Sequence, residues 1–141
     1  MYTYAFPGNI EDDILQIAAQ QIPYMRTEWF SGIMKENEQM LLNMIGCTGG
    51  RVMFYTASGT GAMDAVVENY VAAQGKAFII DGGSFGHRWA QLCEYHKVAC
   101  DVMKVPFAHD IDYAELERQV AASKPQVFLC QHHETSTGQL F

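Results

Sequence analysis

The chain has 141 residues, of which 49% are hydrophobic and 18% charged, and its formal net charge is -7. This composition is ordinary for one globular core, and the acidic balance argues against nucleic-acid or anionic-membrane partners, which need clustered Lys and Arg. We find neither an apolar run of about 18 residues nor the basic and apolar stretches of a signal peptide, so we expect a cytoplasmic location.

Helix and strand candidates alternate along the chain. The helices are expected at 10–21, 31–45, 61–74, 85–96 and 112–123. The strands are expected at 51–56, 77–81, 100–105 and 126–131. Ser31 is the candidate N-cap of the second helix and Gly46 follows its end, Gly75 closes the third helix, and Asp110 or Asp112 caps the last. Strands separated by helices predict βαβ units, and hence an α/β fold with a mainly parallel sheet and flanking helices.

Three polar loops that contain glycine follow strand candidates. They are Tyr55-Thr-Ala-Ser-Gly-Thr-Gly-Ala-Met63, Gly82-Gly-Ser-Phe-Gly-His-Arg-Trp89 and His132-His-Glu-Thr-Ser-Thr-Gly138. The first is a strand, a turn and a helix N-terminus, where unpaired backbone N–H groups can hold a phosphate. By itself it is also consistent with a plain tight turn, since it is neither a Walker loop nor a dinucleotide fingerprint. Three such loops at one sheet edge favour a ligand site.

In order, spacing and kind, these loops resemble the class V aminotransferases, which are fold-type I pyridoxal-phosphate enzymes. Pro7-Gly8 and Met25-Arg-Thr-Glu-Trp-Phe30 resemble further segments of that family. The resemblance implies an N-terminal helical segment at 1–50 and the first half of the large, cofactor-binding domain at 51–141. The family's strand order, 1-7-6-5-4-2-3, implies a sheet that is incomplete without further strands.

The resemblance also assigns roles to five residues. It makes Ser58, Gly59 and Thr60 the cradle of the cofactor phosphate, Phe85 the ring that stacks on the pyridine, and Thr135 the partner of the phenolic oxygen. An aromatic ring gives a flat cofactor both contact area and orientation. Each residue also has a purely structural interpretation: Phe85 as a core aromatic, Thr135 as a turn residue, and Thr60 as a helix N-cap.

No catalytic residue is expected in this chain. In the family, the lysine that carries the cofactor, the aspartate at the pyridine nitrogen and the arginine for the substrate carboxylate all lie further along the sequence. The five lysines are predicted to be surface charges: Lys35, Lys76, Lys97, Lys104 and Lys124. The resemblance therefore implies a transaminase that acts on a small amino acid and a 2-oxo acid. The chain would be inactive alone, and completed by a second chain or a C-terminal part into a subunit that forms homodimers.

Two other functional interpretations remain open. One is a non-catalytic remnant of the same fold that acts as a structural or regulatory partner. The other is a sulfur lyase or desulfurase on this fold, which Phe85 disfavours because desulfurases usually carry a histidine at that position. A complementary chain with the family lysine would favour the transaminase over the remnant.

The cysteines and histidines do not predict a metal centre. Cys130, His132 and Glu134 would share one face of a strand and suit zinc, but no second pair of ligands is spaced to complete the shell. The four cysteines, Cys47, Cys93, Cys100 and Cys130, have no CxxC spacing and are expected to be reduced.

Overall fold

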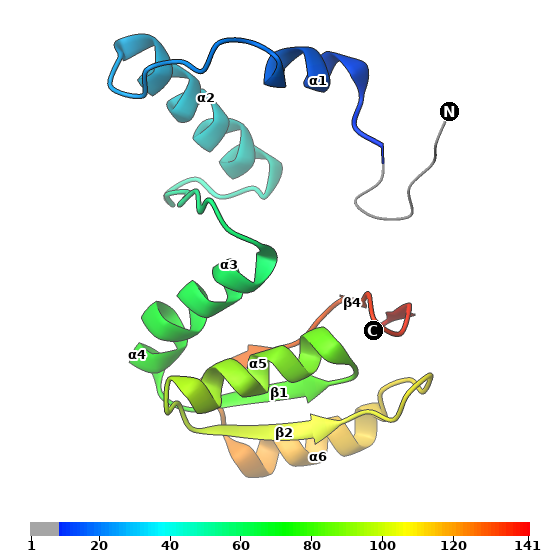
Figure 1. Cartoon of the computed structure of the whole chain (residues 1–141). Helices are drawn as coiled ribbons and strands as arrows, with labels where there is room; N and C mark the ends of the chain where they lie inside the picture. Colours follow the sequence, from blue (N-terminus) through cyan, green and yellow to red (C-terminus); the bar gives the residue numbers. More distant parts are fainter. Residues whose placement is uncertain (1–8) are drawn as a thin grey trace. The chain divides into compact units, whose positions relative to one another are not determined.

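Figure 1 presents the computed structural model of the chain, which describes residues 9–141. The described residues form two compact units, one that ends at Phe54 and one that covers Tyr55–Phe141. The Pro7-Gly8 segment lies outside the described residues. From residue 9 onward, no helix combines the length and the apolar character that crossing a bilayer requires.

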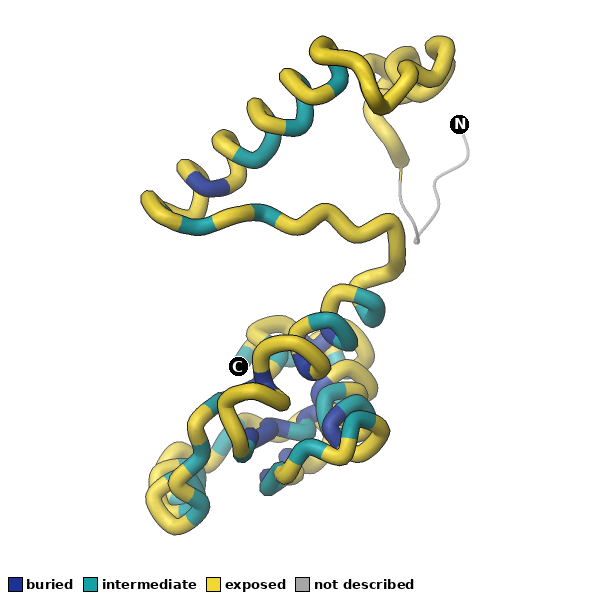
Figure 2. The backbone as a smooth tube through the Cα atoms, turned by 90° about the vertical axis from the view of Figure 1, so that its left-hand side faces the viewer, coloured by how far each residue is buried: buried dark blue, intermediate teal, exposed yellow. Residues whose placement is uncertain are grey.

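The first unit holds two helices, α1 (Asp12–Ala18) and α2 (Glu28–Met44). The prediction that Ser31 caps α2 was wrong, because Thr27 caps it one turn earlier: its hydroxyl oxygen accepts a hydrogen bond from the backbone N–H of Phe30 at 3.2 Å. The predicted end is confirmed, and Gly46 follows it with a φ of 67°. Figure 2 shows that this unit is mostly exposed.

The strand predicted at 51–56 was also wrong. Residues 51–55 have no regular secondary structure, and the backbone N–H of Val52 donates to the Glu38 carboxylate at 2.9 Å instead of to a neighbouring strand. The same oxygen of Glu38 accepts from Arg51 Nε at 2.7 Å. An extended segment becomes a strand only when another strand pairs with its backbone. None of the described strands pairs with residues 51–56.

The second unit is built on a parallel sheet of three strands. They are β1 (Ala77–Asp81), β2 (Cys100–Lys104) and β3 (Val127–Leu129). Their order is β2-β1-β3, with Ala77 in register with Cys100 on one side and Val127 on the other. The strand predictions at 77–81, 100–105 and 126–131 are thus confirmed. These are strands 2, 3 and 4 of the family, so the order β2-β1-β3 is the expected family order 4-2-3 read in reverse. β1 is the central strand, which explains why four of its five residues are buried.

Helices cover both faces of this sheet (Figure 1). They are a continuous run made of α3 (Gly59–Val66), a π-helical segment η1 (Val67–Val71) and α4 (Ala72–Gln74), followed by α5 (Ser84–Tyr95) and α6 (Tyr113–Ser123). Gly75 closes the first run with a φ of 118°. Asp112 caps α6 by accepting the Glu115 N–H at 3.0 Å, which resolves the choice between Asp110 and Asp112.

The hydrophobic core has two layers because side chains alternate between the faces of a strand. The layer under η1 and α5 contains Val67, Val71, Ala77, Ile79, Cys93 and Leu129. The layer toward α6 contains Phe78, Ile80, Met103 and Val105, with Leu116 and Val120 packed against it. β1 therefore anchors both layers through alternate residues.

A short antiparallel hairpin follows the sheet and was not predicted. Its strands are β4 (His133–Glu134) and β5 (Gln139–Leu140), and Gly138 in its turn has a φ of 73°. Strands of two residues are too short to show an alternating hydrophobic pattern. Phe141 follows the hairpin, and its ring lies against Gly82, where a Cβ would collide with it.

Candidate functional site

The candidate site lies where the parallel strands end. β1 ends at Asp81 and β2 at Lys104, and parallel strands bring their carboxyl ends to one edge of the sheet. A pocket of about 330 Å³ opens at this edge, lined by Asp81, Gly82, Gly83, Lys104, Val105, Pro106, Phe107 and Thr137. The loop before α5 and the hairpin turn thus meet beside a cavity, as the sequence predicted for loops at this edge.

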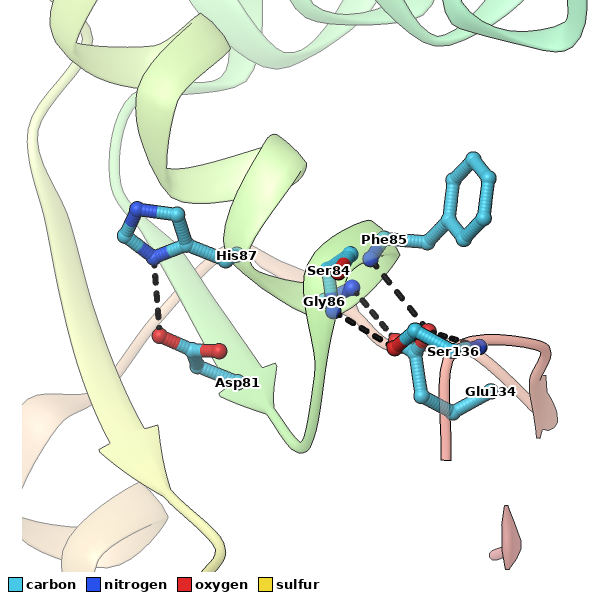
Figure 3. A network of polar contacts seen from close by, with 7 residues as sticks. All are labelled: Asp81, Ser84, Phe85, Gly86, His87, Glu134 and Ser136. Atoms are coloured by element: carbon cyan, nitrogen blue, oxygen red, sulfur yellow. Dashed lines mark hydrogen bonds and ion pairs between the residues drawn. The ribbon is translucent and has the colours of Figure 1, made fainter. Parts of the chain in front are cut away.

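A buried carboxylate joins these two segments. Glu134 is fully buried, and its Oε2 accepts the backbone N–H of Gly86 at 2.8 Å. Its Oε1 accepts the backbone N–H groups of Phe85 at 3.3 Å and Ser136 at 3.2 Å, and the Ser136 hydroxyl at 2.7 Å. Figure 3 shows this network at the start of α5. We use the name Glu134 clasp for Glu134, Ser136 and the backbone N–H groups of α5 that donate hydrogen bonds to these two side chains.

The electrostatics of the clasp favour the ionised carboxylate. Burial by itself would raise the pKa of Glu134. The hydrogen bonds from the Ser136 hydroxyl and from the N–H groups of Gly86, Ser136 and Phe85 outweigh that effect and hold the pKa below its usual value of 4.5. The positive end of the α5 dipole acts in the same direction.

This lowered pKa predicts a pH dependence of stability. Because the folded pKa lies below the unfolded one, Glu134 stabilises the fold above pH 4.5, and this contribution is lost as the pH falls through the folded pKa. In urea titrations from pH 7 downward, the Glu134→Gln variant should lose less stability below pH 4.5 than the wild type. Ser136→Ala, which removes one of the four hydrogen bonds, should show an intermediate slope. Equal slopes in all three proteins would contradict this assignment.

Two glycines make room for the clasp. A Cβ added to Gly83 would lie 2.5 Å from Cγ of Glu134 and 2.5 Å from Oγ of Ser136. A Cβ on Gly86 would lie 2.6 Å from the carbonyl oxygen of Ile80. The Gly-Gly-Ser-Phe-Gly sequence therefore allows α5 to begin close to both β1 and the hairpin.

A second polar pair links β1 to α5. Asp81 Oδ2 lies 3.0 Å from Nδ1 of His87, in the first turn of α5 (Figure 3). The carboxylate is mostly buried, whereas the imidazole is 54% exposed. The pair holds the first turn of α5 against the end of β1. The other ring nitrogen of His87, Nε2, takes no part in this contact.

The structure brings two of the five predicted site residues together. Phe85 is the second residue of α5, and its N–H is part of the clasp. The residue is 41% exposed, and its side chain points away from the carboxylate (Figure 3). Thr135 is exposed and lies between Glu134 and Ser136 in the hairpin turn. The interpretation of Phe85 as a core aromatic is therefore not supported.

The other three predicted residues start the α3 helix. Ser58 is its N-cap, with no side-chain cap hydrogen bond, and Gly59 and Thr60 begin the helix. α3 is tied to α5 by Asp64 Oδ1, which lies 2.7 Å from Nε2 of His96. Within residues 9–141, no hydrogen bond joins the Ser58–Thr60 turn to the clasp. The interpretation of Thr60 as the N-cap is wrong, because Ser58 holds that position.

The geometry does not assemble the zinc site that was considered. β3 ends at Leu129, so Cys130 and His132 do not continue a strand that would align them with Glu134. The Glu134 carboxylate is already surrounded by hydrogen-bond donors. No group of three or more metal-ligating side chains is found in the described part of the chain. The four cysteines are free thiols.

Sequence reasoning missed the central role of Glu134 and Ser136. α5 starts with Gly83 at its N-cap, so its first amides need acceptors from elsewhere. This was not visible in the sequence, because the helix expected at 85–96 would have Ser84, a good cap residue, directly before it. The sequence did not reveal which distant segment would supply them. The pair formed by Asp81 and His87, which are only six residues apart, was also missed.

Comparisons with known proteins agree with this architecture. L-aspartate--glyoxylate aminotransferase of Paracoccus denitrificans is 22% identical over 94% of this chain and 34% of its own length. 2-Aminoethylphosphonate--pyruvate transaminase of Vibrio vulnificus is 30% identical over 59% of this chain and 23% of its own length. No family model matches the chain. The chain spans a quarter to a third of the length of these curated relatives.

The solved structures show the same fold. The ureidoglycine-glyoxylate aminotransferase of Bacillus subtilis superposes with a TM-score of 0.87 at 19% identity, over 96% of this chain and 35% of that chain. These two relatives and this solved structure are all named as aminotransferases or transaminases, and the chain covers about a quarter to a third of each. The chain is similar to the N-terminal part of fold-type I aminotransferases, among them the serine-- and ureidoglycine--glyoxylate and 2-aminoethylphosphonate--pyruvate enzymes.

Proposed function

We propose that this chain supplies the cofactor-phosphate and ring-stacking part of a pyridoxal-phosphate-dependent aminotransferase, which transfers an amino group from a small amino acid to a 2-oxo acid. The observation that carries the proposal is the meeting of the Phe85 and Thr135 segments at the carboxyl edge of the sheet, held by the Glu134 clasp. Glyoxylate or pyruvate is the acceptor named for the relatives, and we extend that class of acceptor to this chain.

The phosphate would bind at the start of α3. The first backbone N–H groups of a helix have no intrahelical partner and carry the positive end of the dipole, and the Ser58 side chain does not cap them. A Cβ added at Gly59 would meet no atom within 4 Å, so the approach to these amides is open. Gly59 and Thr60 would donate their amides, and Ser58 and Thr60 their hydroxyls.

The ring would lie against Phe85. Phe85 is 41% exposed although its backbone N–H is held in the clasp, so a flat apolar ring is accessible on a fixed backbone. Thr135, in the neighbouring turn, would donate its hydroxyl to the phenolic oxygen. Stacking and one directed hydrogen bond together would set the tilt and the rotation of the ring.

Pyridoxal phosphate would supply an electron-withdrawing ring and the carbon that carries the amino group between substrates. The residues of this chain would hold and orient it, while a lysine for covalent attachment and an aspartate at the ring nitrogen would come from a complementary chain or a C-terminal part. We therefore propose that the chain is inactive alone and that completed subunits act as cytoplasmic homodimers. When this chain, the complementary chain and pyridoxal phosphate are mixed and treated with borohydride, the cofactor should become covalently attached to the complementary chain.

The phosphate assignment is tested by a charge placed at Gly59. Binding is followed by two-dimensional amide NMR of the chain. Pyridoxamine 5'-phosphate should shift the amides of Gly59, Thr60, Phe85 and Thr135, and pyridoxamine without phosphate should not shift the first two. Gly59→Glu should weaken binding of pyridoxamine 5'-phosphate at least about tenfold, because its carboxylate repels the phosphate. The helix itself should stay intact, because a carboxylate at a helix N-terminus is favourable.

Gly49→Glu is the matched control. Like Gly59, Gly49 is exposed and has no atom within 4 Å of an added Cβ, but it is not part of the Ser58–Thr60 turn, so Gly49→Glu should leave binding unchanged. If pyridoxamine 5'-phosphate shifts none of the four amides, or if both glutamate variants bind it equally, the proposed cofactor site is wrong. The non-catalytic interpretation of the chain would then be favoured.

A further inference from the structure

The start of α5 depends on a segment about fifty residues away. The N-cap residue Gly83 offers no side chain, and no local cap hydrogen bond is present. Side chains of the hairpin accept the hydrogen bonds of the first three N–H groups of α5 instead. Ser84 N–H donates to Ser136 Oγ at 2.8 Å, and the N–H groups of Phe85 and Gly86 donate to the Glu134 carboxylate. A local Ser or Asp would suffice to stabilise a helix end. A distant cap additionally fixes where the helix end lies relative to the hairpin.

The hairpin turn is also organised around Glu134. Its Ser136 N–H and hydroxyl both donate to the Glu134 side chain. The backbone N–H groups of Thr137 and Gly138 donate to the Glu134 carbonyl oxygen at 3.2 and 2.8 Å. Glu134 thus closes its own turn with its backbone and binds α5 with its carboxylate. Thr135 lies inside this closed turn.

We propose that Glu134 is a positioning residue, which fixes the ring of Phe85 and the side chain of Thr135 relative to each other so that the two cofactor contacts form as one unit. Glu134 itself does not touch the cofactor. The inference rests on the proposed function for the roles of Phe85 and Thr135, but the mechanical coupling of the two segments can be measured without any cofactor.

The clasp requires a carboxylate of this length. Both oxygens accept, and the donors around them are backbone N–H groups and one hydroxyl. Glutamine would place an NH2 group, which is a donor, against one set of these N–H groups. Aspartate is one methylene shorter, and Gly83 already brings the backbone against the Glu134 stem, so the shorter side chain cannot recover both contacts by moving α5 closer.

The coupling is tested by amide hydrogen exchange of the full chain, read by NMR. In the Glu134→Gln variant, the amides of Phe85 and Gly86 and also those of Thr137 and Gly138 should each lose at least about tenfold in protection, because both segments are released together. The matched control is Asp112→Asn. Asp112 also accepts a backbone N–H at a helix start, so the chemical change is the same, and the four amides should keep wild-type protection.

Two results would overturn the inference. If Glu134→Gln exposes the α5 amides but leaves Thr137 and Gly138 protected, Glu134 is only a helix cap. If no amide changes, the clasp does not hold the segments. Should Glu134→Gln fail to fold, Ser136→Ala removes the two hydrogen bonds of the Ser136 hydroxyl, to Ser84 N–H and to Glu134. It should raise exchange at Ser84 and at Gly138 together; a change at one site alone would count against coupling. If the wild type does not bind pyridoxamine 5'-phosphate, the proposed function is contradicted. The inference about the clasp is then still tested by the hydrogen-exchange experiment, which needs no cofactor.

Discussion

Replacing Phe78 with alanine should lower the free energy of unfolding of the second unit by about 3–5 kcal/mol. Phe78 is 1% exposed, lies on the central strand and packs in the layer that faces α6. Truncation leaves a cavity that neighbouring strands cannot fill without breaking their register with β1. Urea unfolding can be followed through Trp89 of α5, which packs against the core, in a Trp29→Phe background that removes the other tryptophan.

Phe128→Ala is the matched control. Phe128 is in register with Phe78 on β3, and their rings stack with centroids 6.1 Å apart, but Phe128 is 46% exposed. We expect a loss of only about 1 kcal/mol, the value of an aromatic pair. If Phe78→Ala leaves no folded protein, Phe78→Leu should retain the same ranking at a smaller cost. Equal losses at the two positions would contradict the described position of the core.

Gly86→Ala should destabilise the second unit by about 2–3 kcal/mol. The added Cβ would lie 2.6 Å from the Ile80 carbonyl oxygen and 3.2 Å from Cα of Asp81. Both are backbone atoms, which cannot move aside as a flexible side chain can. Relief requires α5 to move away from β1, which would also stretch the bond from the Gly86 N–H to Glu134. The measurement is urea unfolding at pH 7, with amide exchange at residue 86 as a local readout.

Gly32→Ala provides the control for the change itself. Gly32 lies inside α2 and has no atom within 4 Å of an added Cβ. Alanine there should stabilise the helix by about 0.5–1 kcal/mol, because glycine costs more backbone entropy. Opposite signs for the two variants would show that the space around Gly86, and not helix propensity, decides its identity. A neutral or stabilising Gly86→Ala would contradict the close contact between α5 and β1.

Local patterns were read correctly where a short segment carries its own signal. The strand at 77–81 is an apolar run bounded by loops, and α2 and α4 are followed by glycine at Gly46 and Gly75. The start of α2 was placed one turn late because both Thr27 and Ser31 are good caps, and local sequence does not choose between them. The segment 51–56 has strand character, but none of the described strands pairs with it.

By itself, the sequence determined the alternation of helices and strands, the family resemblance and the loops that bear Ser58, Phe85 and Thr135, because each depends on residues close together in the chain. Only the tertiary structure decided that Glu134 caps α5, that the Phe85 and Thr135 segments meet, and that the Ser58–Thr60 turn has no hydrogen bond to them among residues 9–141. The physical reason is that a buried carboxylate and its donors, about fifty residues apart, are selected by the fold and leave no periodic trace in the sequence.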